Sequence, residues 1–117
     1  MTSPRTGTPD SVKIVQPIDH IDIGNAFELK AGLQSLLRSG QKRVVIDLAG
    51  VQYIDSAGLS ALMAIVHAFE GAGGAVRLCC PQPTVLKILQ LTKLDEYLPL
   101  AADLEEATDQ LADAPVI

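Results

Sequence analysis

The sequence predicts an α/β fold, with about four helices around a central sheet of about four or five mainly parallel strands. Short apolar runs rich in β-branched residues alternate with longer stretches whose apolar residues recur at helical spacing. These helical stretches stand where parallel strands need right-handed crossovers. The length of 117 residues suits one hydrophobic core, so a single domain is expected over 12–112.

Two extended pieces open the predicted domain. Residues 12–16 alternate between apolar and polar, which predicts a short strand, and Pro17 ends it because proline lacks the amide donor. Residues 18–23 alternate again and predict a second extended piece with one polar face. The residues before them are rich in Ser, Thr, Pro and Gly, which predicts a mobile leader over 1–11.

A helix is predicted over 25–39. Asn25 and Glu28 form a capping-box pattern at its start, and Gly40 stands at the C′ position, where a left-handed backbone is common. Apolar residues at helical spacing are expected to face the sheet: Ala26, Leu29, Leu33, Leu36 and Leu37.

The central stretch is 44–69. Its β-branched start predicts a buried strand, followed by a glycine turn and a second short apolar piece over 51–54. Asp55 and Ser56 then open a helix that continues to Phe69. Both residue types are good N-caps, so this junction places a serine hydroxyl at the electropositive start of a helix.

A glycine-rich turn over 71–74 leads to a strand over 75–79. Pro81 and Pro83 end that strand and open another helix, because the first turn of a helix tolerates proline. The apolar stripe of this helix consists of Val85, Leu86, Ile88, Leu89 and Leu91.

The last part of the domain is predicted to hold a short strand and a helix. Residues 97–100 are the strand candidate. Asp103 and Glu106 repeat the capping-box pattern, and the helix is expected to continue through Leu111. Residues 113–117 are expected to be a frayed tail.

The charge balance argues against two classes of partner. A net charge of −5 offers no basic patch for nucleic acid or an anionic membrane. No apolar stretch approaches the roughly 20 residues that span a bilayer, and the amino terminus lacks the apolar segment of a signal peptide. We therefore expect no direct nucleic-acid binding, no membrane insertion and a cytoplasmic location.

The residues capable of chemistry are poorly spaced for catalysis. His67 lies about 16 Å along the predicted helix from Ser56, too far to act as its base. Ile54 stands where a nucleophile elbow needs glycine, and the glycines of 71–74 lack the Lys-Ser/Thr ending of a phosphate-binding loop. No enzyme activity is expected.

The two cysteines, Cys79 and Cys80, are neighbours at the end of a predicted strand. Because successive strand side chains point to opposite faces, we expect no disulfide between them and one thiol in the core. The cysteines and the two histidines lack the spacing of metal ligands. Neither a metal nor a cofactor is therefore expected.

The run Val45-Ile46-Asp47-Leu48-x-Gly50-Val51-x-Tyr53-Ile54-Asp55-Ser56-Ala57-Gly58-Leu59 resembles the STAS family, named for sulfate transporters and anti-sigma factor antagonists. The similarity extends over about 12–111. It includes Ile21-Asp22-x-x-x-Ala26, Gly73-Gly74-x-Val76-Arg77-Leu78, Leu91-Thr92-x-Leu94-Asp95 and the run from Asp103 to Ala107. One departure is Asp19, which stands where family members often carry glycine.

The resemblance implies a STAS-type fold and a binding function. In the small stand-alone members, the serine directly after the aspartate is a phosphorylation switch, which here is Ser56. Unphosphorylated, such a protein binds an anti-sigma factor that is also a serine kinase and so releases a sigma factor; a serine phosphatase restores binding. The implied partner-binding residues are Asp22, Asp55, Ser56, Ala57 and Gly58.

Two other functions remain open at this point. One is a non-switching STAS subunit of a membrane transporter or lipid-transport complex. The other is a regulator that uses the same serine exchange in a pathway without sigma factors.

Several residues of this stretch also fit purely structural roles. Ser56 fits a helix cap, and Asp22 fits a solvated loop charge. Asp47 interrupts a buried strand, so it is expected to be hydrogen-bonded and structural. The helix after Ser56 is apolar nearly all round, which fits either a partner surface or burial under a neighbouring helix.

Overall fold

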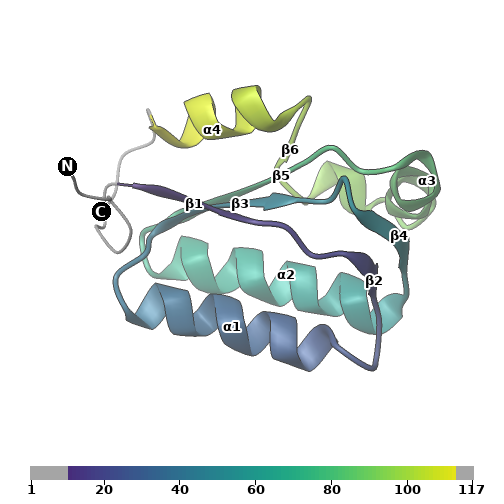
Figure 1. Cartoon of the computed structure of the whole chain (residues 1–117), viewed down its shortest axis with the longest axis horizontal. Helices are drawn as coiled ribbons and strands as arrows, with labels where there is room; N and C mark the ends of the chain where they lie inside the picture. The colour runs from purple at the N-terminus through teal and green to yellow at the C-terminus, as the bar shows by residue number, and fades with distance from the viewer. Residues whose placement is uncertain (1–10, 113–117) are drawn as a thin grey trace.

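A computed structural model describes residues 11–112 of the chain, shown in Figure 1. The predicted leader, apart from Ser11, and the predicted tail over 113–117 lie outside the described residues. Within 11–112, no helix is long and apolar enough to cross a membrane.

Residues 11–112 contain six strands, which form a four-stranded sheet and a two-stranded sheet. The main sheet has the order β1-β3-β5-β6, with β1 at Val12–Val15, β3 at Arg43–Asp47, β5 at Ala75–Cys79 and β6 at Leu100–Ala101. The strands β2 (Asp19–Ile21) and β4 (Val51–Ile54) pair with each other. Every strand pair among the described residues is parallel. The predicted α/β fold with a mainly parallel sheet is confirmed.

The helices cover both faces of the main sheet. Figure 1 shows α1 (Ala26–Arg38) and α2 (Ser56–Gly71) on one face and α4 (Leu104–Ala112) on the other. The helix α3 (Pro83–Leu91) packs beside β4, and a short 3₁₀ helix, η1 (Leu94–Glu96), follows it. Alternate residues of β3 therefore enter two cores: Val44 and Ile46 face α1 and α2, whereas Val45 packs under α4.

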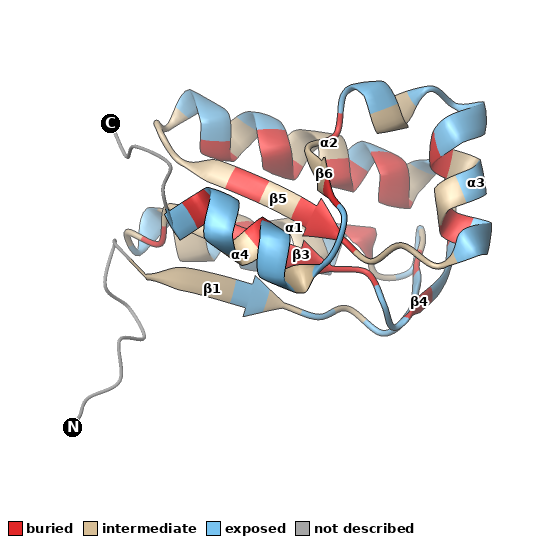
Figure 2. Ribbon diagram, turned by 90° about the horizontal axis from the view of Figure 1, so that it is seen from above, coloured by how far each residue is buried: buried red, intermediate tan, exposed pale blue. Residues whose placement is uncertain are grey.

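The apolar surplus of α2 is explained by α1. Of its 16 residues, those buried between the sheet and α1 are Gly58, Leu59, Ala61, Leu62, Ile65, Val66 and Phe69. Figure 2 shows these buried positions along α2. Burial under a neighbouring helix therefore accounts for most of the surplus, and only a narrow strip of α2 faces solvent.

The two predicted capping boxes have different outcomes. At α4 the cap forms, because the Glu106 amide donates to Asp103 Oδ1 (2.8 Å), but Glu106 Oε1 accepts from the amide of Ala102 (2.7 Å), one residue before the Asp103 amide that the box would use. At α1 the prediction was wrong, because Asn25 makes no side-chain cap. Its side-chain Nδ2 instead donates to the His20 carbonyl (2.8 Å), and its Oδ1 accepts from the Asp22 backbone amide (2.9 Å), which closes the preceding loop.

Local backbone geometry accounts for two further observations. Asp19 adopts a left-handed backbone (φ 67°), so it takes the conformation that glycine would adopt, which aspartate tolerates better than most residues. The strand predicted over 97–100 begins later, at Leu100, because residues 94–96 form η1 and only Leu100 and Ala101 reach β5.

Asp47 is structural, as predicted. It is 7% exposed, and its two carboxylate oxygens accept from the Ala49 amide (Oδ1, 3.0 Å) and from Gln16 Nε2 (Oδ2, 3.0 Å). These bonds tie the end of β3 to the residue that follows β1 and to the turn before β4.

The cysteine prediction was partly wrong. Both thiols are free and Cys79 is buried, as expected, and burial raises the pKa of Cys79 to about 12. However, the two sulfur atoms do not diverge to opposite faces: they lie within 4.8 Å of each other and of a carboxylate oxygen of Asp47. The cause is the left-handed backbone of Cys80 (φ 63°), which breaks the alternation of the strand.

Candidate functional site

Two strand-to-helix turns lie side by side at one end of the molecule. Because β2 and β4 are parallel and pair Ile21 with Ile54, their carboxyl ends meet at the same edge. The chain then turns from β2 into α1 and from β4 into α2. Figure 1 shows the start of both helices at this end.

Asp55 joins the two turns. Its Oδ1 accepts from the Gly58 amide (2.9 Å) and caps α2, while its Oδ2 accepts from the Ile23 amide in the other turn (3.0 Å). The Asp55 amide donates to the Ile21 carbonyl (3.2 Å). These amide donors, that of Gly58 most strongly, lower the pKa of the Asp55 carboxyl below its ordinary value of 3.8.

Ser56 is the first residue of α2 and is exposed. Because Asp55 provides the cap, the Ser56 hydroxyl is not used for capping. Among residues 11–112, its side chain has no hydrogen-bond partner. The interpretation of Ser56 as a helix cap and nothing more is therefore wrong, and its hydroxyl is open to solvent at the positive end of a 16-residue helix.

The other candidate residues near this hydroxyl differ in how far they are exposed to solvent. Ala57 is half-buried, and Gly58 is buried, where an added Cβ would come within 3.0 Å of the Ile21 carbonyl oxygen. Asp22 is 29% exposed at its side chain, where its Oδ1 accepts from the Gly24 amide (2.9 Å). Gly58 thus allows the close approach of α2 to β2, and Asp22 shapes the turn before α1.

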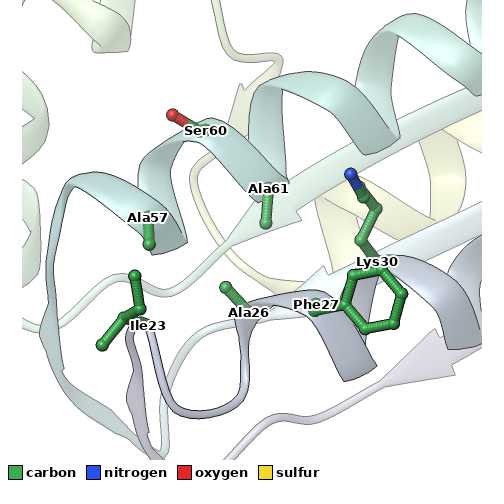
Figure 3. A pocket seen from close by; sticks show the side chains of 7 residues that line it. All are labelled: Ile23, Ala26, Phe27, Lys30, Ala57, Ser60 and Ala61. Carbon is green, nitrogen blue, oxygen red and sulfur yellow. The ribbon is translucent and has the colours of Figure 1, made fainter.

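An apolar groove of about 280 Å³ runs between the first turns of α1 and α2, shown in Figure 3. Ile23 and Phe27 line one side and are 83% and 74% exposed, unusually high for large apolar side chains. Ala57 lies at its near end, and Lys30 projects from α1 toward its far end. Ala57, the residue that follows Ser56, is part of the lining of this groove.

A second hollow of about 420 Å³ flanks Ser56 on the other side of α2. It is lined by Ser56, Leu59, Ser60, Met63, Thr92 and Leu94, so it lies between α2 and the segment after α3. The exposed strip of α2 is therefore a ridge with an apolar hollow on each side.

The sequence analysis missed Ile23, Phe27 and Lys30. One signal was available for Phe27, since it lies outside the apolar stripe formed by Ala26, Leu29 and Leu33. Packing in the core does not explain an aromatic residue on the polar side of a helix, so such a residue suggests a binding surface. The closeness of Ile23 to α2 had no such signal, because it depends on the pairing of β2 with β4.

The contribution of Asp55 to stability is expected to depend on pH. A carboxyl whose folded-state pKa is lowered stabilises the fold fully above its ordinary value of 3.8 and loses that contribution as the pH falls through the lowered value. Asp55→Ala should therefore be less stable than the wild-type chain at pH 7, and the difference should shrink at acid pH. Urea unfolding of both chains between pH 7 and pH 2.5 measures this, and a gap that stays constant would contradict it.

The chain belongs to the STAS domain family, whose model matches residues 3–107. Among its relatives is a Thermotoga maritima protein that is named provisionally as an anti-sigma factor antagonist. The two are 28% identical over 103 residues, which cover 87% of this chain and 91% of the relative. The crystal structure of that protein superposes with a TM-score of 0.79 over 86% of each chain.

Two further proteins share this similarity. BtrV of Bordetella bronchiseptica, also named provisionally as an anti-sigma factor antagonist, is 30% identical over 74% of this chain and 75% of its own. The Bacillus cell fate determinant SpoIIAA, an anti-sigma factor antagonist, has been solved in unphosphorylated and phosphorylated forms, with TM-scores of 0.69 and 0.65 over more than 90% of each chain. At 16% and 18% identity, SpoIIAA shows the common fold alone.

Proposed function

We propose that this protein is an anti-sigma factor antagonist whose binding is switched by phosphorylation of Ser56. Unphosphorylated, it binds an anti-sigma factor that is also a serine kinase, which frees a sigma factor for transcription. The kinase transfers the γ-phosphoryl group of ATP to Ser56 Oγ, ADP leaves, and the hydroxyl proton passes to the kinase's base or to solvent. The complex then dissociates, and a serine phosphatase hydrolyses the phosphoserine and restores binding.

The observation that carries this proposal is the exposed hydroxyl of Ser56 on the ridge of α2. A kinase must bring a hydroxyl in line with the γ-phosphate, so the acceptor has to protrude and be unengaged. Ser56 meets both conditions, since Asp55 provides the cap in its place.

The fold is expected to tolerate the phosphate. A dianion at the exposed start of a helix is favoured by about 0.3–1 kcal/mol through the helix dipole. The phosphate is expected to weaken partner binding instead. It would add two negative charges beside the Asp55 carboxylate, at a surface that has to be desolvated when the partner binds.

The surroundings of Ser56 also suit a protein partner. We assign partner contacts to Asp22, Asp55, Ser56 and Ala57, and we assign to Gly58 the supporting role of holding α2 close to β2. The two hollows beside the ridge would receive apolar side chains of the partner, with Ile23 and Phe27 forming one wall. Contacts of this kind, apolar at the centre with charged groups at the rim, are usual in reversible complexes.

The relatives support the same function. The Thermotoga and Bordetella proteins carry the name of anti-sigma factor antagonist, and SpoIIAA occurs in both phosphorylation states that the proposal requires. The role requires the cytoplasm, the location that the sequence predicts.

Incubation with the cognate anti-sigma kinase and ATP tests the proposal. We expect one phosphate per chain, placed on Ser56 by fragment mass spectrometry and absent from Ser56→Ala. The neighbouring exposed Ser60, one helical turn further along α2, should remain unmodified. Phosphate on another residue, or co-purification with a transporter in place of a soluble kinase, would contradict the switch.

A further inference from the structure

Two thiols and a carboxylate meet at the carboxyl edge of the main sheet, on the side of α4. Asp47 ends β3, Cys79 ends β5, and the two are register partners, so their side chains lie on the same face. Cys80 follows, and its left-handed backbone brings its side chain back to the side of Cys79. One ligand atom from each of the three residues lies within 4.8 Å of the other two.

Two hydrogen bonds fix the orientation of the Asp47 carboxylate. Gln16 Nε2 donates to Oδ2 and the Ala49 amide donates to Oδ1, each at 3.0 Å. Each oxygen keeps a further lone pair, so these bonds orient the carboxylate without using up its capacity to bind. Outer hydrogen bonds of this kind usually accompany metal ligands and fix their direction.

We propose that Asp47, Cys79 and Cys80 form a three-ligand site for a thiolate-binding divalent cation of the zinc class. Tetrahedral zinc places sulfur and oxygen ligands about 3.5–3.8 Å apart, and the three ligand atoms lie within 4.8 Å of one another, so binding would draw the side chains somewhat closer together. Two thiolates with one carboxylate favour zinc over magnesium or calcium, which prefer oxygen ligands. Water fills the fourth position.

Binding of the ion needs no redox chemistry, and the three anionic ligands leave the occupied site with one net negative charge. Each thiol loses one proton to solvent when the ion binds, so two thiolates and one carboxylate face a charge of +2. Asp103, at the start of α4, adds negative potential at Cys79 and so favours a cation. Cys80 is half-buried and provides the route from solvent to the site.

The bound ion would act on the fold, and it would do so whether or not Ser56 is a switch. It would link the ends of β3 and β5 immediately before the turn that leads through β4 to Ser56. Its expected effect is a higher melting temperature, because it binds only the folded arrangement of the three ligands.

Titration of the reduced full-length chain with cobalt(II) chloride tests the site. We expect a near-ultraviolet thiolate-to-cobalt absorption band that saturates at one equivalent, and its displacement by zinc chloride. The band should disappear in Cys79→Ser and in Cys80→Ser. If Cys79→Ser fails to fold, the result for Cys80→Ser tests the site. Cys80 is only half-buried and serine is nearly isosteric with cysteine, so this variant should fold.

Two further variants distinguish a specific metal site from unspecific metal binding. Gln16→Leu should keep the band but weaken cobalt affinity about 10- to 100-fold, because Asp47 loses one of its orienting donors. His20→Gln removes an exposed histidine that lies beside Asp22 and is not one of the three ligands, and it should leave the titration unchanged. The proposal would be overturned by the absence of a thiolate band or by a band that survives Cys80→Ser. It would also be overturned if the chain lost two hydrogens by forming a disulfide and bound no metal.

Discussion

Ser56→Glu is expected to weaken binding to the cognate anti-sigma kinase by roughly 30- to 5,000-fold. This range corresponds to the cost of about 2–5 kcal/mol for leaving a charge buried and unpaired at an interface. Ser56 stands at the top of the ridge between the two hollows, so a partner that fills both must cover it. The Asp55 carboxylate, already engaged by the Gly58 and Ile23 amides, cannot move away from the added charge.

Isothermal titration calorimetry with three variants measures this effect. Ser56→Ala should bind as the wild-type chain does and resist phosphorylation, since it removes only the hydroxyl. Ser35→Glu adds the same charge at an exposed position in the later half of α1 and should bind normally. Equal affinities for Ser56→Glu and Ser35→Glu would show that the partner does not cover Ser56.

Gly58→Ala is expected to destabilise the fold by about 1–3 kcal/mol or more, the usual range for overpacking. An added Cβ would come within 3.0 Å of the Ile21 carbonyl oxygen and of Ile54 Cγ1, closer than Cβ atoms approach in real structures. The backbone oxygen cannot rotate aside, so α2 would have to move away from β2. That shift would also break the Asp55 contacts that join the two turns.

Gly32→Ala provides the matched control. Gly32 is exposed in the middle of α1 and has no atom within 4 Å of the added Cβ, so this change should stabilise the chain by up to about 1 kcal/mol through helix propensity. Urea unfolding of the two variants should therefore move the midpoint in opposite directions. A Gly58→Ala chain as stable as the wild type would mean that this contact relaxes freely.

Much of this structure follows from local sequence patterns. The β-branched run before the central turn, the apolar stripe of α1 and the Asp103–Glu106 cap each use residues within a few positions of one another. Propensity and periodicity describe such interactions directly. The Asp-Ser junction was likewise visible, because a strand, a cap and a helix follow in order along the chain.

The features that were missed depend on residues far apart in the sequence. Asn25 has the residue type of a cap, yet it closes the preceding loop through His20 and Asp22. Ile23 lies beside the start of α2 only because β2 pairs with β4, which no local pattern indicates. In both cases contacts between separate segments decided the position of the side chain.

By itself, the sequence determined the class of fold, the order of its elements and the presence of a serine where a strand passes into a helix. Only the tertiary structure decided that Asp55 caps the helix and leaves the Ser56 hydroxyl exposed, and that Cys79 and Cys80 turn to the same side beside Asp47. The physical reason is the range of the interactions. Capping and periodicity act within one or two turns of chain, whereas the position of a side chain relative to another strand is set by pairing and packing.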